Sequence, residues 1–369
     1  MSQGKVGGRE LKPDPTINKC QSLSRSSAAN MLWPRDAAKL IASKSQNVSI
    51  VNEGVKKVAN VIAEAVRDGK LDMEEFKQNE VLPLNKGLTK AQLADWVFLI
   101  DSLNFNFWTP HGVPKYTVEY EGQKRSGYLA MVSAVNRAID EGKKMYDPKF
   151  YSQLTIEDIK HIFRSDTAST MPLFEDRVKV LKEVGDKLIE KYDGTFVNVL
   201  RKADGSAVKL IDIVTSEFPC FNDTATFEGQ KVAIFKRVQI LAADLWMLYR
   251  GEGLGAFTDI DSLTMFADYR VPQAMAYFGV LKYSDSLMEK LNKEELFQSG
   301  DREEVEIRGC SIHAAELIAT ETREILASWN QPSGGINSVK VDFFLWDYRL
   351  TNATQLDSIP YHRVRCIYY

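Results

Sequence analysis

The stretch KVAIFKRVQILAADLWMLY, residues 231–249, is unusually apolar for its length. A segment of this length that is apolar all round predicts a buried helix, so we expect it at the centre of a helical protein. Lys236 is the exception within the stretch. Its side chain either extends to a solvated rim, which the adjacent Arg237 favours, or reaches into a pocket.

Most segments outside this stretch also show helical periodicity, with apolar residues three and four positions apart. Thr155–Asp158 is typical of a capping box that opens a short helix. Residues 116–120 alternate in polarity, and Glu121–Gly122 could turn them into a hairpin. The sequence therefore predicts a mainly α fold with at most a short β-hairpin. The other predicted helices are residues 34–41, 54–67, 89–103, 128–140, 174–200, 260–266, 272–280 and 304–329.

Length and composition limit the domain organisation and the class of ligand. Residues 1–30 are rich in glycine, serine, lysine and proline without apolar periodicity, which predicts a mobile N-terminal tail. Residues 31–369 are predicted to form a single large helical domain, and a division into two helical lobes stays open. The net charge of -3 argues against a protein that binds nucleic-acid backbone over a broad surface.

Neither a metal centre nor a membrane segment is indicated. The four cysteines and four histidines are scattered and match no zinc-site spacing, so no metal ligands are predicted. The longest apolar runs, such as residues 96–100, are too short to span a bilayer, and the N-terminus lacks the apolar core of a secretory signal. Few and dispersed cysteines fit a reducing compartment, so we expect a cytoplasmic protein.

The segment LTMFADYRVPQ, residues 263–273, places Asp268 just ahead of a helix that starts near Pro272. One interpretation is that Asp268 caps this helix or interacts with its dipole. The other is that its carboxylate is held beside backbone N–H groups, opposite a cationic transition state. Arg270 likewise either binds an anion or forms a surface salt bridge.

Aromatic residues surround polar ones in three further segments. FLIDSLNFNFW, residues 98–108, has Asp101, Asn104 and Phe105 at spacings that share one helical face, which suits a flat polar base. VDFFLWDY, residues 341–348, offers Asp347 and Tyr348 in the same way. PYHRVRCIYY, residues 360–369, is too aromatic for a disordered tail, so we expect it to be packed.

Together these four segments resemble the queuosine salvage family, the queuosine 5′-phosphate N-glycosylases/hydrolases, over residues 31–369. The resemblance implies a helical fold similar to that of the helix-hairpin-helix DNA glycosylases. It also implies that Asp268 is the catalytic carboxylate and that Lys236 is a pocket lysine. The substrate-binding residues that it implies are Phe266, Ala267, Arg270, Asp347 and Tyr348, with Asp101 and Asn104 as motif residues without an assigned role.

The implied reaction is hydrolysis of the N-glycosidic bond of queuosine 5′-phosphate, which releases queuine for salvage into tRNA modification. The expected partner is therefore a small-molecule nucleotide, with no direct nucleic acid, membrane, metal or cofactor. Two alternatives stay open. One is a DNA glycosylase/lyase of the helix-hairpin-helix type, in which Lys236 forms a Schiff base with the sugar. The other is a non-catalytic helical binding protein, in which every motif supplies core or capping residues.

Overall fold

A computed structural model of the chain describes residues 31–71, 82–333 and 335–369, so the predicted tail, residues 1–30, lies outside the described residues. None of the helices in these ranges is both long and apolar enough to cross a membrane. The α-helices are α1 Pro34–Lys44, α2 Asn52–Arg67, α3 Lys90–Ser102, α4 Gly127–Asp140, α5 Pro148–Tyr151, α6 Ile156–Ile162, α7 Phe174–Lys191, α8 Val197–Ala203, α9 Ala207–Glu217, α10 Lys236–Leu248, α11 Val271–Tyr277, α12 Asp285–Asn292, α13 Arg302–Ser328, α14 Ser338–Thr351 and α15 Ala353–Leu356. Shorter 3₁₀ helices are η3 Leu84–Lys86, η4 Pro219–Phe221, η5 Gly253–Gly255 and η6 Ile260–Ser262.

The prediction of a mainly α fold is confirmed. The sequence predicted at most one β-hairpin, however, and the described ranges contain more strand pairs than that. Within the described ranges the strands pair into four two-stranded sheets. The predicted hairpin is the sheet β2–β3, and β4–β5 is a second hairpin. β1 with β6, and β7 with β8, join segments far apart in sequence, and such pairs leave no local turn signal. The strands are β1 Val48–Ile50, β2 Thr117–Tyr120, β3 Gln123–Ser126, β4 Thr224–Phe227, β5 Gln230–Ala233, β6 Leu281–Tyr283, β7 Leu296–Phe297 and β8 Arg363–Val364.

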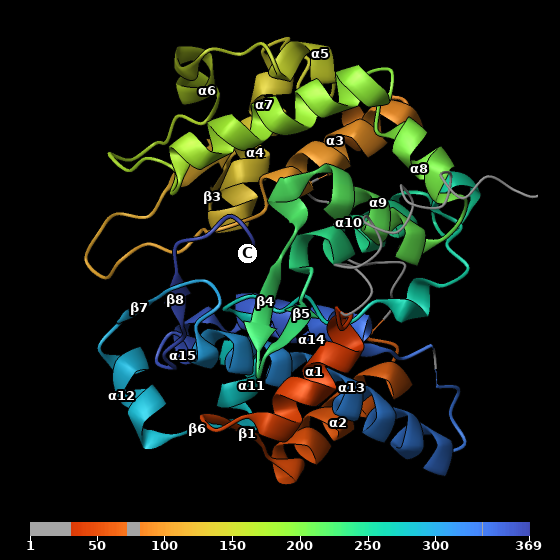
Figure 1. Ribbon diagram of the computed structural model, residues 1–369, viewed down its shortest axis with the longest axis vertical. Coiled ribbons are helices and arrows are strands. Elements are labelled where there is room, and N and C mark those ends of the chain that lie inside the picture. The colour runs from red at the N-terminus through yellow and green to blue at the C-terminus, as the bar shows by residue number, and fades with distance from the viewer. Residues whose placement is uncertain (1–30, 72–81, 334) are drawn as a thin grey trace, which may run out of the picture.

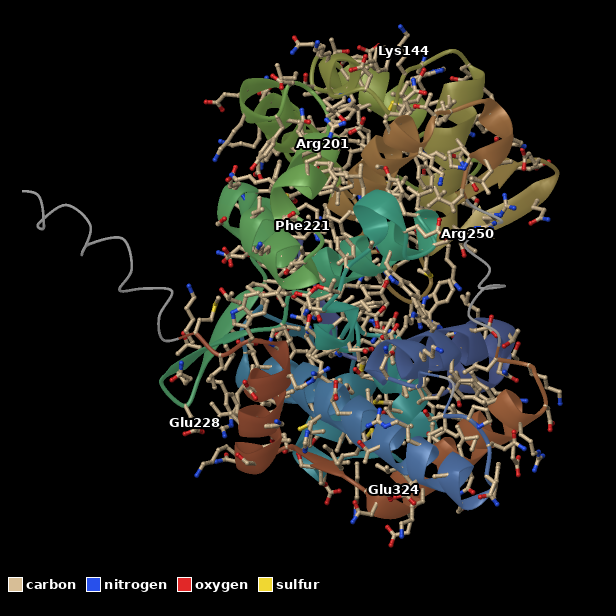
Figure 2. The ribbon with its side chains drawn as sticks, turned by 90° about the vertical axis from the view of Figure 1, so that its right-hand side faces the viewer. Lys144, Arg201, Phe221, Glu228, Arg250 and Glu324 are labelled. Carbon is tan, nitrogen blue, oxygen red and sulfur yellow. The ribbon has the colours of Figure 1, made fainter. Side chains whose placement is uncertain are left out.

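Two hydrophobic clusters organise the molecule, and we call them the first and the second core. The first core draws on α3 to α10, which lie in the upper half of Figure 1. The second core draws on α1, α2 and α11 to α15, which lie in the lower half. In the turned view of Figure 2, Lys144 and Arg201 lie in the half of the molecule that contains the first core. Glu324 lies in the half that contains the second core.

Residues 231–249 do not form one helix, so this prediction was wrong. β5 pairs antiparallel with β4, with Thr224 opposite Ala233, and α10 begins only at Lys236. Between them, Phe235 has a left-handed backbone with φ of 52°. Val232 and Ala233 of β5 are buried and apolar like much of α10, so hydrophobicity alone could not separate the end of the strand from the helix. The sharp turn at Phe235 places Lys236 in the first turn of α10.

Two other predicted helices are interrupted. The segment 174–200 divides into α7 and α8, because Asp193 and Gly194 turn the chain with φ of 55° and 75°. The segment 260–266 forms only η6, and the residues after Ser262 are irregular up to α11. This irregular segment carries Phe266 and Asp268.

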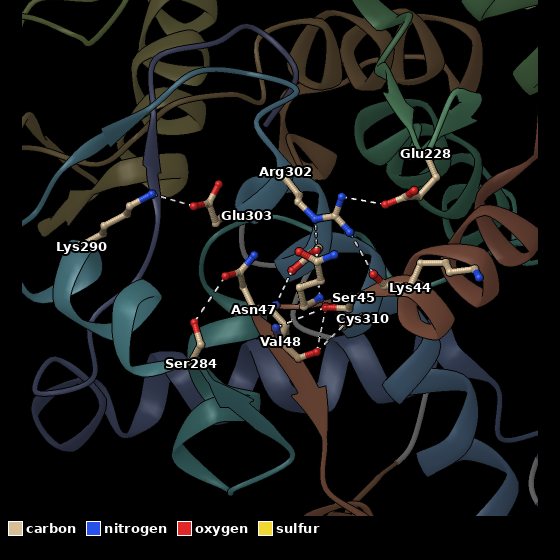
Figure 3. Close-up of polar contacts among 12 residues, drawn as sticks. Lys44, Ser45, Asn47, Val48, Glu228, Ser284, Lys290, Arg302, Glu303 and Cys310 are labelled. Atoms are coloured by element: carbon tan, nitrogen blue, oxygen red, sulfur yellow. Dashed lines mark hydrogen bonds and ion pairs between the residues drawn. The ribbon is translucent and has the colours of Figure 1, made fainter.

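Ion pairs and hydrogen bonds hold α13 in place within the half of the molecule that contains the second core (Figure 3). Arg302 forms an ion pair with Glu228 at 2.7 Å and donates to the carbonyl of Lys44, which joins α13 to the β4–β5 turn and to α1. Glu306 is fully buried and accepts a hydrogen bond of 2.7 Å from the backbone N–H of Asn47. α13 in turn packs against α11 and α14, two elements that carry pocket residues.

Candidate active site

A pocket of about 1220 Å³ is lined by members of both cores. Its wall comes from α4, α10 and α14, from the irregular segment before α11, and from the chain ahead of β2 and around β8. The wall combines aromatic side chains with charged ones. The charged residues of the wall include Lys236, Asp244, Asp268, Arg270, Asp342 and Asp347.

Asp268 lies at the start of a helix and also lines the pocket, so its position is compatible with both interpretations, and its catalytic role stays a prediction. Its Oδ1 accepts hydrogen bonds from the backbone N–H groups of Arg270 at 2.7 Å and Val271 at 2.9 Å. Val271 begins α11, and Pro272 occupies its first turn. These two bonds orient the half-buried carboxylate at the pocket wall.

Lys236 lies inside the pocket, so the alternative of a solvated rim is wrong. The residue is only 5% exposed, and its Nζ lies 3.4 Å from both the backbone carbonyl and the side-chain Oδ1 of Asn104. Burial lowers the pKa of Lys236, and the negative charge of Asp268 opposes that shift. A lysine and an aspartate from distant segments therefore share one low-dielectric site.

The neighbouring Arg237 is also buried, and it supports the turn that carries Asn104. Its guanidinium donates to the carbonyls of Asp101 and Ser102 at the end of α3, which have no partner within the helix. Arg177 donates to the carbonyl of Phe105 in the same turn. Two buried guanidinium groups thus fix residues 101–105 and, with them, the oxygen atoms that face Lys236.

Asp342 is a pocket residue that sequence reasoning missed. Its Oδ1 accepts a hydrogen bond of 3.0 Å from the backbone N–H of Phe266, and the residue is 4% exposed. Burial raises the pKa of Asp342 well above its usual value, and the charge of Asp268 adds to this effect. Asp342 lies in VDFFLWDY, but the aromatic residues at its C-terminal end drew the prediction to Asp347 and Tyr348.

The structure brings six of the predicted residues to the pocket wall: Asn104, Lys236, Phe266, Asp268, Arg270 and Asp347. Phe266 meets Phe343 edge to face, with ring centroids 5.8 Å apart, and both rings line the pocket. Together they form an aromatic corner next to Asp342.

Three predicted residues lie outside the pocket wall as far as the structure describes it. Tyr348 is on the other side of α14, where its ring packs 4.7 Å from that of Phe278. Ala267 is fully buried, and its carbonyl accepts a hydrogen bond from Arg308. Asp101 is fully buried behind Asn104, whose Nδ2 lies 3.4 Å from Asp101 Oδ1.

Cationic side chains gather around Tyr361 at the pocket wall. The guanidinium groups of Arg270 and Arg363 lie 4.5 Å and 4.4 Å from the centre of the Tyr361 ring. Arg363 forms an ion pair with Glu294, whereas Arg270 donates to an amide oxygen, Oε1 of Gln273. Arg270 therefore brings positive charge to the pocket through a contact that does not neutralise it.

In the described ranges, no group of three or more histidine, cysteine, aspartate or glutamate side chains is arranged to hold a metal ion. His111 lines the pocket without such companions in the described part of the chain. The arrangement instead offers carboxylates, an ammonium, a guanidinium and aromatic rings.

Comparison with known proteins defines the class. A sequence profile described as queuosine salvage protein matches residues 84–369, which include every site residue named above. The chain belongs to this family. The mouse queuosine 5′-phosphate N-glycosylase/hydrolase is 44% identical over 339 residues, which cover 92% of this chain and 99% of the relative. A protein of the same name from Sphaerobacter thermophilus is 38% identical over 282 residues, which cover 76% of this chain and 82% of the relative.

Proposed function

We propose that this protein hydrolyses the N-glycosidic bond of queuosine 5′-phosphate and releases queuine for salvage into tRNA modification. The observation that carries the proposal is Asp268. Its carboxylate is oriented by two backbone N–H groups in a pocket that also holds Lys236, in a chain 44% identical to a protein named for this activity. The substrate is a small nucleotide, and we expect no direct contact with nucleic acid and a cytoplasmic location.

The reaction breaks the bond between C1′ of the ribose and N9 of the base, and both bonding electrons leave with the base. The sugar then has oxocarbenium character, as in glycoside hydrolysis. Asp268 stabilises this cation because its carboxylate is fixed beforehand in a partly desolvated pocket. Lys236 faces Asp268, so a basic side chain lies beside the carboxylate at the pocket wall. The leaving base takes up one proton, water adds its oxygen to C1′ and gives up one proton in exchange, and the products are neutral queuine and ribose 5-phosphate.

The leaving base needs help from hydrogen bonds, because a 7-deazaguanine has carbon where other purines carry the basic N7. Asp342 is suited to this role because burial keeps its carboxyl group protonated at a higher pH than usual. Phe266 and Phe343 supply aromatic contact for the base. Asp347, on the same wall, stays a candidate for the donor face of the base.

The 5′-phosphate is assigned to Arg270, whose guanidinium can form charge-assisted hydrogen bonds with it. The arginines around Tyr361 make this end of the pocket the favourable one for a dianion. Residues 31–369 are proposed to act as one glycosylase-like domain, with a fold similar to that of the helix-hairpin-helix DNA glycosylases.

The test is a panel of substrates with base release followed by mass spectrometry. We expect queuine from queuosine 5′-phosphate and no base from damaged duplex DNA. Borohydride trapping of the protein on that DNA, lost in Lys236→Met, would instead identify a DNA glycosylase/lyase. Binding of the nucleotide without release of base would identify a binding protein. Either result would overturn the proposed function.

A further inference from the structure

Gln273 is a buried glutamine that links two arginines of the pocket wall. Its Oε1 accepts hydrogen bonds of 3.0 Å from Nη1 of Arg270 and of 3.0 Å from Nε of Arg349. Gln273 lies in α11 and Arg349 in α14, and these two helices pack against each other. Arg349 lines the pocket together with Arg270, and the proposed reaction gives it no role. One neutral oxygen atom therefore holds two cationic side chains next to each other at the pocket wall.

The other neighbours of Gln273 fix which way its amide group points. Its Nε2 donates to the backbone carbonyls of Leu356 at 2.8 Å and Ile359 at 2.6 Å. A carbonyl only accepts hydrogen bonds, and a guanidinium only donates them. The amide oxygen must therefore face the arginines, and the flipped amide is excluded. A glutamate here would turn a carboxylate oxygen toward the two carbonyls, so this set of partners selects a neutral side chain.

The two guanidinium groups keep both N–H donors and positive charge for a ligand. Each carries five N–H groups, of which the contact with Gln273 takes one from Arg270 and one from Arg349. Nη2 of Arg349 also pairs with Asp357, whose side chain is 54% exposed, so solvent screens this ion pair. Burial, and next the like charge of Arg270, lower the pKa of Arg349. A bound anion would relieve this repulsion.

The spacing of the two arginines suits a phosphate group. Two nitrogen atoms that each lie 3.0 Å from one oxygen atom are at most about 6 Å apart. Phosphate oxygens can accept from both guanidinium groups at this separation, with charge-assisted hydrogen bonds to each.

Aromatic rings restrict Arg270 further. Its guanidinium carbon lies 5.3 Å from the centre of the Tyr269 ring and 4.5 Å from that of the Tyr361 ring. The two rings stack on each other with centroids 5.4 Å apart. A guanidinium that an amide oxygen and two rings already hold loses little conformational entropy when it binds a ligand.

We propose that Gln273 is a positioning residue that holds Arg270 and Arg349 as a two-armed binding site for the 5′-phosphate of the nucleotide. This inference rests on the proposed function for the identity of the ligand, and it adds Arg349 as the second phosphate-binding residue. The hydrogen bonds of Gln273 set the spacing of the two cations, and its neutral amide leaves their charge available to a dianion. The site therefore favours a phosphate monoester over the unphosphorylated nucleoside.

The test measures the phosphate preference, which is the ratio of kcat/KM for queuosine 5′-phosphate to kcat/KM for queuosine. Arg349→Gln and Gln273→Met are each expected to lower this ratio about tenfold, as for the loss of one charge-assisted hydrogen bond. The double variant should lower it by clearly less than the hundredfold expected of independent sites, because both changes remove the same contact. If Gln273→Met does not fold, Gln273→Asn replaces it, because asparagine keeps the amide and withdraws it from the arginines by one methylene group.

Gln239→Met is the matched control for the loss of a buried glutamine. Gln239 is also 1% exposed, and it joins two segments by donating to the carbonyl of Ile234 and accepting from the backbone N–H of Thr264. Gln239→Met should lower Tm, as Gln273→Met does, and leave the phosphate preference unchanged. A role of Gln273 in stability alone predicts the same unchanged preference for both variants.

The outcomes separate this inference from the proposed function. An unchanged phosphate preference in Arg349→Gln or in the folded Gln273 variant would overturn the inference, and so would an equal fall in Gln239→Met. If wild type releases base from neither substrate, the proposed function fails, and calorimetry with ribose 5-phosphate and ribose still tests the phosphate site. Wild type should bind ribose 5-phosphate at least about tenfold more tightly than ribose, with most of the difference lost in Arg349→Gln. Equal affinity of wild type for the two sugars would refute the site.

Discussion

Replacing Asp268 with asparagine separates its two roles, because the side chains have the same shape and differ in charge. Asparagine keeps Oδ1, which accepts the N–H groups of Arg270 and Val271. Both residues are good helix caps, so the change in stability should be about 1 kcal/mol or less, a few degrees in Tm.

The catalytic loss follows from the charge. Opposite unit charges about 4 Å apart attract by about 4 kcal/mol at an effective dielectric constant of about 20. Removing that attraction from the transition state slows the reaction roughly a thousandfold. The assay is single-turnover release of queuine by Asp268→Asn, with the concentration of enzyme saturating so that binding does not limit the rate.

Asp259 provides the matched control. Its carboxylate also accepts two backbone N–H groups at the start of a helix, those of Ala207 at 2.6 Å and Val208 at 3.2 Å, but it lies away from the pocket wall. Because both oxygens of Asp259 accept hydrogen bonds, Asp259→Asn should lower Tm at least as much as Asp268→Asn, with activity near wild type. A folded Asp268→Asn variant that turns over at the wild-type rate would refute the mechanism.

Three further predictions concern the phosphate, metal ions and acid stability. Queuosine 5′-phosphate should exceed queuosine in kcat/KM by about a hundredfold, and Arg270→Gln should remove most of that difference in a side-by-side comparison. Activity should persist in excess EDTA, and a loss restored by one divalent ion would contradict this. Burial holds the pKa of His362 at about 3, so the unfolded chain binds the additional proton between about pH 6.5 and 3. Stability should therefore fall as pH drops through this window, by up to about 1.4 kcal/mol per pH unit, and His362→Phe should lack this part of the slope in denaturation curves.

The sequence predicted local features of the fold well where their cause is local. The capping box at Thr155–Asp158 and the hairpin at Glu121–Gly122 depend on residues within four positions of each other, and both are present. The β4–β5 hairpin was missed because its buried residues Val232 and Ala233 lead directly into the apolar segment that becomes α10. Their true state depends on the partner strand, and periodicity carries no information about it.

Residue types that are unusual for their surroundings were the best guide to the site. Asp268 and Lys236 stood out in apolar segments, and both line the pocket. Which side of α14 faces the pocket could not be predicted in the same way, because VDFFLWDY has aromatic residues on all sides and so lacks a polar face. The choice of Tyr348 over Asp342 followed from that ambiguity, and only the packing of Tyr348 against Phe278 resolves it.

The contact between the turn at Asn106 and the segment around β8 has a consequence for how the protein folds. Asn106 Nδ2 donates to the carbonyl of Val364, 258 positions away in the chain, and its backbone N–H donates to that of Tyr369. Closing so long a loop loses conformational entropy before the compensating contacts have formed. Contacts of large sequence separation therefore form slowly. Tyr369 lines the pocket, so the pocket is complete only after this closure. During refolding, helical signal should therefore recover before the capacity to bind the nucleotide.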